Sequence, residues 1–325
     1  MNRKAVICLL TAALLFTVPF VEAQKPAKIP RIGYLEGGSP ATSLSVLEAF
    51  RQGLRELGYV EGQNIVIEDR WGEGRNDRLP ELAAELVRLK VDVIVTRGDV
   101  ATLAAKQATS AIPIVMATVG NPLGFVASLA RPGGNITGLS NLAVDISGKW
   151  LELLKEAAPR ITRAAVLWNP ANPTHAVFWE ETQIAAQALG VSLVRLDFRS
   201  PDDFDSAFTA MTKERVGALV VFPDPMIHAD RKRIADKLIK TRVPAIANQR
   251  EFAEAGGLMS YGATALSNAR RAATYVDKIL KGRKPADLPV EQPMRFELVI
   301  NLKTANQIGL TIPPWLLMRA DKVIK

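Results

Sequence analysis

Short β-rich runs alternate with amphipathic helical patterns along this chain, and this alternation restricts the fold more than any other feature. Residues 31–35 form a strand-like run, after which leucine and phenylalanine recur at helical spacing from Leu44 to Leu57. Residues 91–96 are almost continuously apolar, as a strand buried on both faces of a parallel sheet must be. Strands that alternate with helices predict an α/β fold with parallel sheets.

The alternation runs through five strands and then starts again, which indicates two similar units. Strand-like runs cover residues 31–35, 64–68, 91–96, 112–116 and 135–138 in the first unit, and residues 164–168, 191–196, 218–222, 243–247 and 258–261 in the second. Helical patterns separate most of these runs, including one expected over residues 122–129. We therefore predict two doubly wound parallel-sheet lobes, each with its own core.

The C-terminal segment does not have the pattern of a third lobe. Residues 266–280 have the pattern of a single amphipathic helix, and residues 290–301 are strand-like with Pro293 as an interruption. One helix and one strand bury too little apolar surface to form a core of their own. We expect both to complete the two lobes that precede them.

The N-terminus has the pattern of a secretory signal peptide. Two basic residues precede an apolar run over residues 5–21, and a small-x-small cleavage site ends at Ala23. The apolar run is shorter than the ~20 residues that a membrane-spanning helix needs. We therefore expect residues 1–23 to be a cleaved signal peptide and the mature protein to be periplasmic.

The charge and the cysteine content exclude several kinds of partner. The formal charge is +8 over 325 residues, but the basic side chains are scattered over predicted helix faces, as on a solvated surface. The single cysteine, Cys8, lies in the expected signal peptide, so the mature chain has no disulfide and no cysteine metal site. We expect a monomer that binds no nucleic acid, cofactor or metal.

Two lobes placed side by side leave a cleft between them, and ligands of open α/β sheets bind outside the carboxyl ends of the strands. The loops that follow these strand ends carry polar and aromatic side chains that suit a small molecule. Ten of these loop residues are candidate ligand contacts: Gly37, Ser39, Thr96, Gly98, Thr118, Trp168, Asn169, Asn172, Asp224 and Asn248.

Several candidates also have a purely structural explanation. Gly98 lies at a strand–helix junction, where glycine lets the backbone approach an anion, but Asp99 beside it suits an ordinary helix N-cap. Asp224, between two prolines, is either an exposed carboxylate that receives an ammonium group or a turn aspartate. Trp168 either covers a ligand or packs in the core.

The chain shows no pattern of catalytic residues. Its two histidines, His175 and His228, are isolated in the sequence and are expected on the surface. The sequence contains no HExxH, GxSxG or P-loop motif, and the mature chain has no cysteine nucleophile. We therefore expect a protein without catalytic residues that is not an enzyme.

Four segments resemble one protein family. They are residues 50–64 (FRQGLRELGYVEGQN), 126–138 (VASLARPGGNITG), 254–262 (EAGGLMSYG) and 290–302. On these segments the chain resembles the ABC-transporter substrate-binding proteins whose characterised members include tryptophan- and tyrosine-binding proteins. The resemblance extends over about residues 28–325.

The resemblance implies the type I periplasmic-binding fold, in which the chain crosses three times between two lobes. A late helix returns to the first lobe, and a final strand crosses back to the second. Under this division lobe I comprises residues 28–138 plus 263–283, and lobe II comprises residues 139–262 plus 284–325.

The resemblance also implies how an amino acid would be held. In the amino-acid-binding members, the first lobe holds the ligand's carboxylate and an acidic residue of the second lobe holds its amine. Thr96, Gly98 and Asp224 occupy positions suited to these roles. The loop over residues 36–40 departs from the first loop expected of the tryptophan binders.

These observations lead to an expected function and two alternatives. We expect an exported solute-binding protein that captures a small, amino-acid-like molecule by hinge closure and delivers it to an ABC permease in the inner membrane. A periplasmic ligand-sensing module for a receptor kinase would have the same sequence features. A secreted hydrolase or isomerase is disfavoured because no nucleophile motif is present.

Overall fold

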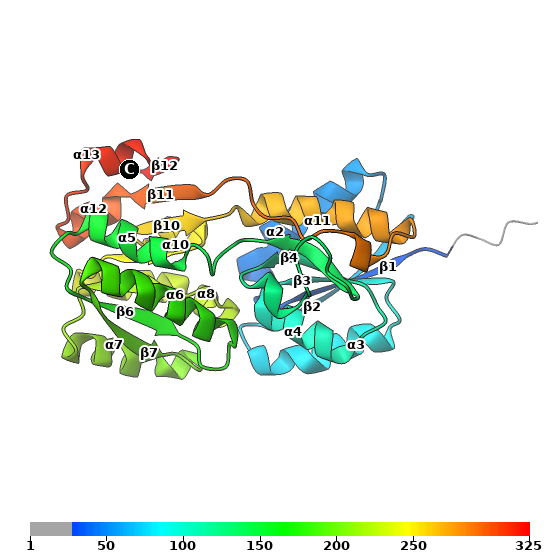
Figure 1. The fold of residues 1–325 in the computed structure, drawn as a ribbon, viewed down its shortest axis with the longest axis horizontal. Coiled ribbons are helices and arrows are strands. Elements are labelled where there is room, and N and C mark those ends of the chain that lie inside the picture. Colours follow the sequence, from blue (N-terminus) through cyan, green and yellow to red (C-terminus); the bar gives the residue numbers. More distant parts are fainter. Residues whose placement is uncertain (1–27) are drawn as a thin grey trace, which may run out of the picture.

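The computed structural model describes residues 28–325. The expected signal peptide over residues 1–23, with Cys8, lies outside the described residues. Two α/β lobes stand side by side along the long axis of the molecule (Figure 1). Among residues 28–325, none of the helices combines the length and the apolar character needed to cross a bilayer.

The first lobe is built on a five-stranded parallel sheet with the order β2-β1-β3-β4-β5. Its strands are β1 (Arg31–Glu36), β2 (Val66–Trp71), β3 (Val93–Arg97), β4 (Ile114–Val119) and β5 (Ile136–Ser140). The order places β3 at the centre with β1 and β4 on either side, and the burial of nearly every residue in these three strands explains their mostly apolar sequences.

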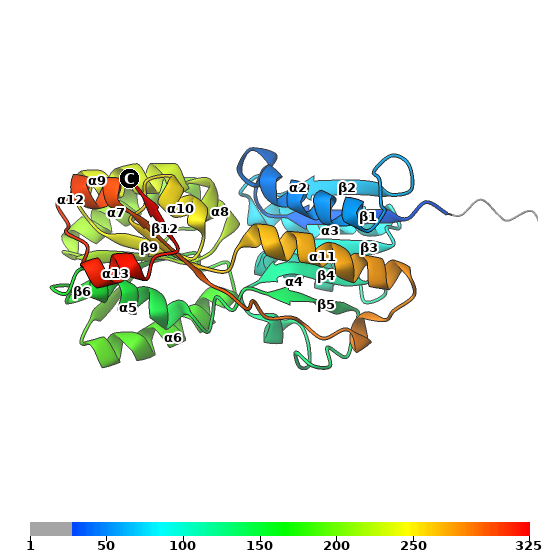
Figure 2. The ribbon, with the colours of Figure 1, turned by 90° about the horizontal axis from the view of Figure 1, so that it is seen from above.

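Helices cover both faces of this sheet. Helices α2 (Pro40–Glu56) and α11 (Ala265–Leu280) pack together on one face (Figure 2), and α3 (Leu79–Arg88) and α4 (Asp99–Ala108) cover the other. The apolar residues of each helix recur at helical spacing, so each helix buries one stripe against the sheet. The two faces have separate cores, one around Phe50 and Tyr34 and one around Leu86 and Ile94.

The second lobe is built on a seven-stranded sheet with the order β12-β11-β10-β9-β8-β6-β7. Its strands are β6 (Arg163–Trp168), β7 (Ser192–Asp197), β8 (Ala218–Val221), β9 (Ala245–Ala247), β10 (Met259–Gly262), β11 (Glu297–Asn301) and β12 (Lys322–Ile324). The pair β10–β11 is antiparallel and the other pairs are parallel. The late strand β11 therefore joins the sheet with reversed direction.

The helices of this lobe also form two layers. They are α5 (Ser147–Ala157), α6 (Thr174–Leu189), α7 (Phe204–Lys213), α8 (Pro225–Ala229), α9 (Arg231–Thr241), α10 (Arg250–Glu254), α12 (Leu302–Ile308) and α13 (Pro314–Met318). Trp150 and Phe178 anchor the core under α5 and α6, where their rings meet edge to face with centroids 6.1 Å apart. Phe204 and Phe208 anchor the opposite core.

The chain passes between the lobes three times, as the type I periplasmic-binding fold requires. The first passage follows β5, the second joins β10 to α11, and the third leads into β11 (Figures 1 and 2). Helix α11 packs on α2 in lobe I, and β11 pairs with β10 in lobe II. The predicted fold class, two doubly wound lobes with three crossovers, is confirmed.

Two expected elements differ in the structure. Residues 122–129 contain only a 3-10 turn (Pro122–Gly124) instead of a helix, and the Ala127 backbone amide donates to the Pro132 carbonyl at 3.0 Å. The strand expected over residues 290–301 is confined to β11, since its first part crosses between the lobes.

The third passage begins later than the expected boundary at residue 284. A 3-10 turn (Pro285–Asp287) lies against β5, and the Thr137 hydroxyl donates to the Leu288 carbonyl at 2.5 Å. Val290 is buried in the core of lobe I, and the Glu291 amide donates to the Gly138 carbonyl at 2.9 Å. The apolar side chain of Val290 thus holds this segment on lobe I.

Gly53 makes the close contact between α2 and α11 possible. A Cβ atom at this position would lie 2.4 Å from the Arg270 carbonyl oxygen. We expect Gly53→Ala to lower the unfolding free energy by about 1–3 kcal/mol, since the backbone of α11 must shift, although alanine favours a helix by about 1 kcal/mol. Urea unfolding would measure this, with the exposed neighbour Gln52→Ala as control. A stabilised Gly53→Ala protein would contradict the prediction.

Candidate functional site

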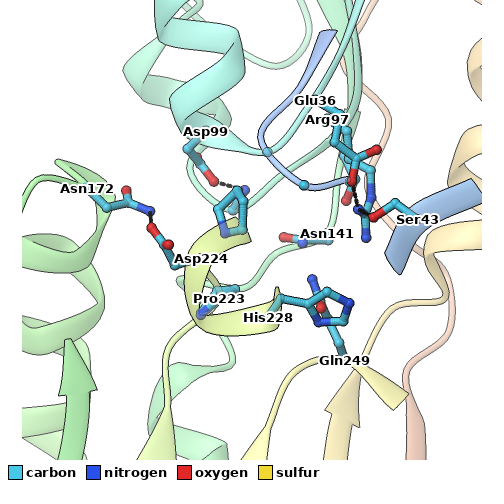
Figure 3. A pocket seen from close by; sticks show the side chains of 15 residues that line it. Glu36, Ser43, Arg97, Asp99, Asn141, Asn172, Pro223, Asp224, His228 and Gln249 are labelled. Atoms are coloured by element: carbon cyan, nitrogen blue, oxygen red, sulfur yellow. Dashed lines mark hydrogen bonds and ion pairs between the residues drawn. The ribbon is translucent and has the colours of Figure 1, made fainter. Parts of the chain in front are cut away.

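A pocket lies between the lobes, at the carboxyl ends of the parallel strands. It contains about 560 Å³ of empty space, part of it open to solvent. Its walls come from loops after β1, β3 and β4 in lobe I and after β6, β8 and β9 in lobe II (Figure 3). The lining residues are Glu36, Gly38, Ser43, Arg97, Gly98, Asp99, Thr118, Gly120, Asn141, Asn172, Pro223, Asp224, Pro225, His228 and Gln249.

A buried ion pair forms the lobe I wall. The Arg97 Nη1 atom donates to Glu36 Oε1 and, at 3.0 Å, to Ser43 Oγ. Tyr34 donates its hydroxyl to the other Glu36 oxygen at 2.9 Å, so both carboxylate oxygens of Glu36 are occupied. The Arg97 Nε atom is buried and has no hydrogen-bond partner. Buried polar groups are normally paired, so this unpaired donor is an exception within the pocket wall.

Asp224 forms the corresponding acidic position on lobe II. It is the N-cap of α8, and its Oδ1 accepts from the Met226 amide at 2.9 Å. Its Oδ2 accepts from the side-chain amides of Asn169 (3.0 Å), Asn172 (3.1 Å) and Asn76 (3.3 Å). Asp224 is 3% exposed and caps α8, so of the two alternatives the structure has the turn aspartate and not the exposed carboxylate. The side-chain amides of three asparagines surround the Asp224 carboxylate and exclude water from it.

The lobes touch directly beside the pocket. The Asn76–Asp224 hydrogen bond joins lobe I to lobe II, and a Cβ atom at Gly37 would lie 2.7 Å from Pro225 Cγ. Asn76 Oδ1 is buried there without a partner. The two lobes are therefore in direct contact beside the pocket.

Asp99 supports the pocket from the start of α4. Its carboxylate accepts the Gly120 and Asn121 amides, each at 3.0 Å, and so fixes the loop after β4. Burial raises the pKa of Asp99 above its ordinary value. The helix N-cap is Gly98, whose φ of +86° explains why glycine stands there.

His175 is not a surface residue, contrary to expectation, and His228 is half-buried. His175 is fully buried. Its Nδ1 accepts from the backbone amide of Asn169 at 2.9 Å, and its Nε2 lies 3.3 Å from the Pro223 carbonyl oxygen. His228 lies in the pocket wall near Gln249 (Figure 3). Burial lowers the pKa of both histidines, and the charge of Arg97 lowers that of His228 further.

These lowered pKa values predict that stability decreases in mild acid. Between the folded pKa and the unfolded value of ~6.5, the unfolded chain binds more protons, so stability rises with pH there. We expect unfolding free energy to fall below pH 6.5 by up to about 1.4 kcal/mol per pH unit for each histidine. Urea unfolding from pH 5.5 to 7.5 tests this, and His228→Gln should lower the slope. An identical slope in that variant would assign the effect elsewhere.

Four of the ten predicted residues line the pocket: Gly98, Thr118, Asn172 and Asp224. Gly37 lies against Pro225, which lines the pocket. Asn169 is not in the lining, but its side-chain amide donates to Asp224. Ser39 is the N-cap of α2, and Asn248 lines two neighbouring cavities beside this pocket. The binding roles of these residues remain predictions.

Thr96 and Trp168 lie outside the pocket. Thr96 is fully buried and its hydroxyl lies 2.8 Å from the Thr102 hydroxyl, because side chains alternate along β3 and Thr96 points toward α4. Trp168 packs edge to face on Trp179 with centroids 6.3 Å apart, and the Arg195 guanidinium lies 5.6 Å from its centroid. The structural explanation of Trp168 therefore holds in this structure.

Seven polar or charged side chains that line the pocket were not among the predicted contacts: Glu36, Ser43, Arg97, Asp99, Asn141, His228 and Gln249. Arg97 had the clearest signal, because it directly follows Thr96 at the end of a buried strand. Charged residues at such positions are seldom buried without a partner, and Glu36 ends the neighbouring strand. No group of three or more potential metal ligands occurs among the residues that the structure describes.

The two-lobed fold and its interlobe pocket define a solute-binding protein of the type I periplasmic-binding class. The chain belongs to the ABC transporter substrate binding protein family, whose model matches residues 39–324. The expected family is thereby confirmed.

Three proteins of known sequence or structure illustrate what this chain is similar to. A tyrosine-binding protein of Clostridioides difficile is 25% identical over 266 residues, which cover 81% of this chain and 76% of that protein. The structure of a conserved domain protein from Vibrio cholerae is 27% identical, with a TM-score of 0.86 over 91% of this chain and all of that one. An ABC domain from Streptococcus pneumoniae in complex with L-Trp is 27% identical, with a TM-score of 0.83 over 91% and 99%.

Proposed function

We propose that this protein is the periplasmic receptor of an ABC importer and captures an amino-acid-like zwitterion between its lobes. The observation that carries this proposal is the distribution of charge in the pocket. Arg97 on lobe I has an unpaired buried Nε, while Asp99 and Asp224 lie on the other side of the pocket (Figure 3). A zwitterion complements both sides, with its carboxylate at Arg97 and its ammonium group at the acidic side.

The acidic side retains capacity for an ammonium group. Asp224 Oδ1 accepts a single hydrogen bond, from Met226, and a carboxylate oxygen has two lone pairs. Glu36 is paired with Arg97, whereas Asp99 and Asp224 have no salt-bridge partner among the residues that the structure describes, so this side of the site attracts positive charge. The tyrosine-binding relative and the tryptophan-bound structure support an amino acid as the ligand.

The family supports the remaining parts of this proposal. Its members are ABC transporter substrate-binding proteins, so the partner is a permease in the inner membrane that accepts the closed form. The protein acts as a monomer, after export through the signal peptide expected at residues 1–23. Binding, rather than chemistry on the ligand, is its task.

Mass spectrometry of small molecules released by denaturing the purified mature protein tests the proposal. We expect an α-amino acid, and calorimetric titration of the refolded protein with that amino acid should show binding. Release of a ligand without an ammonium group, together with no heat from any of the twenty amino acids, would refute the proposed function.

Hinge closure gives a separate prediction. A ligand that contacts Arg97 and Asp224 together selects the closed form, because the two residues belong to different lobes. We expect small-angle scattering to show a smaller radius of gyration at saturating ligand than without ligand. Scattering of the ligand-free protein after refolding serves as reference. An unchanged radius at saturation would contradict the closure mechanism.

A further inference from the structure

Nearly all of the side chains that line the pocket are polar or charged. Pro223 and Pro225 are its only apolar side chains among the residues that the structure describes. The other lining residues are glycines or carry a carboxylate, guanidinium, imidazole, amide or hydroxyl group. Small-molecule pockets are usually lined predominantly by apolar and aromatic side chains, so this lining is unusual.

The aromatic residues near the pocket are engaged elsewhere. Phe178 is fully buried behind Gly120, where its Cζ atom would lie 2.8 Å from a Cβ atom at that glycine. Trp168 packs on Trp179 and His175. Tyr34 is buried and its hydroxyl is bonded to Glu36. None of these three rings is among the residues that line the pocket.

We infer that the ligand is an amino acid with a non-aromatic, hydrogen-bonding side chain, and that the pocket discriminates against tryptophan and tyrosine. This inference rests on the proposed function. An indole or phenol ring in this pocket would displace the water that is hydrogen-bonded to the amide and charged side chains of the lining. The ring would form few hydrogen bonds with these groups in place of the water. A buried polar group left unpaired in this way weakens binding strongly. A hydroxyl, amide or charged side chain replaces the lost water contacts.

Gln249 is the lining residue that tests this selectivity most cleanly. It lies in the pocket wall at the N-cap of α10, near His228, and does not belong to the Glu36–Arg97 pair or to the Asp224 cap. Gln249→Met keeps its length and removes the amide. Gln187→Met on the exposed face of α6 is the matched control.

Calorimetric titration of the refolded protein with all twenty amino acids tests the inference. We expect the tightest ligand to have a polar, non-aromatic side chain and to bind at least about 100-fold more tightly than L-tryptophan and L-tyrosine. An aromatic or aliphatic amino acid as the tightest ligand would overturn the inference and leave the proposed function intact. Binding of none of the twenty would instead refute the proposed function, and the inference with it.

The variants provide the second measurement. Gln249→Met should lower the affinity for the polar ligand at least about tenfold and reduce the ratio of this affinity to that for L-tryptophan. Gln187→Met should change the affinity for the polar ligand by no more than about twofold. If Gln249→Met binds L-tryptophan and the polar ligand with unchanged affinities, the polar lining does not set selectivity and the inference fails.

Discussion

Arg97→Met should destabilise this protein strongly and abolish tight ligand binding, while adding Glu36→Gln should restore the stability alone. Glu36 and Arg97 form a buried ion pair, with side chains 2% and 10% exposed. Removing one partner of such a pair leaves an uncompensated buried charge, at about 3–5 kcal/mol. In the double variant the Tyr34 hydroxyl can still donate to the amide oxygen that Glu36→Gln introduces, so no charge is left buried.

Binding should not recover with stability. The double variant lacks the guanidinium that is proposed to hold the ligand carboxylate, and truncating one partner of a buried charge pair lowers affinity by about 2–5 kcal/mol. Since 1.4 kcal/mol corresponds to a factor of ten, we expect at least about thirtyfold weaker binding. Urea unfolding and calorimetric titration measure the two effects separately.

An exposed ion pair provides the matched control. Arg88 bonds Glu81 at 2.7 Å, with side chains 60% and 70% exposed. Such pairs contribute about 0–1 kcal/mol, so Arg88→Met should change neither stability nor affinity appreciably. A double variant that binds ligand as the unmodified protein does would show that Arg97 serves the structure alone.

Asp224→Ala should lower the unfolding free energy by at least about 2–3 kcal/mol and weaken ligand binding at least about tenfold. The substitution removes the α8 cap, at about 0.5–2 kcal/mol, and leaves the amides of Asn169 and Asn172 without their acceptor. An exposed carboxylate, one of the two alternatives that the sequence left open, would have little effect on folding. The network of buried donors around the carboxylate reverses that expectation.

Asp224→Asn separates the two roles of this residue. Asparagine keeps a cap acceptor for the Met226 amide and so retains the cap, but its NH2 group faces the donors of Asn169 and Asn172, and it has no charge for an ammonium group. We expect affinity to fall at least about tenfold in both variants, measured by calorimetry with the co-purified ligand. Asp236→Ala, which removes an exposed carboxylate of α9, is the control. Affinity within about twofold in Asp224→Asn would mean that Asp224 is only a cap.

The sequence predicts which loops surround the site, but it does not predict which residues of those loops line the pocket. Parallel strands place their carboxyl ends at one edge, so the loops after residues 96, 168 and 222 were expected around the cleft, and they are. The choice between neighbouring residues could not be made. Thr96 was selected, but Arg97 enters the pocket, since strand side chains alternate and the β3–β4 register shifts between these two residues.

The sequence by itself determined the fold class, because the alternation of strands and helices is a local pattern and the family segments are contiguous. The tertiary structure alone decided which polar groups are satisfied. The Asp224 carboxylate accepts hydrogen bonds from the side-chain amides of Asn76 and Asn169, which precede it in the chain by 148 and 55 positions. Arg97 meets Glu36 across 61 residues. Hydrogen bonds between such distant residues leave no periodic trace in the sequence, and they decide which charges remain available to a ligand.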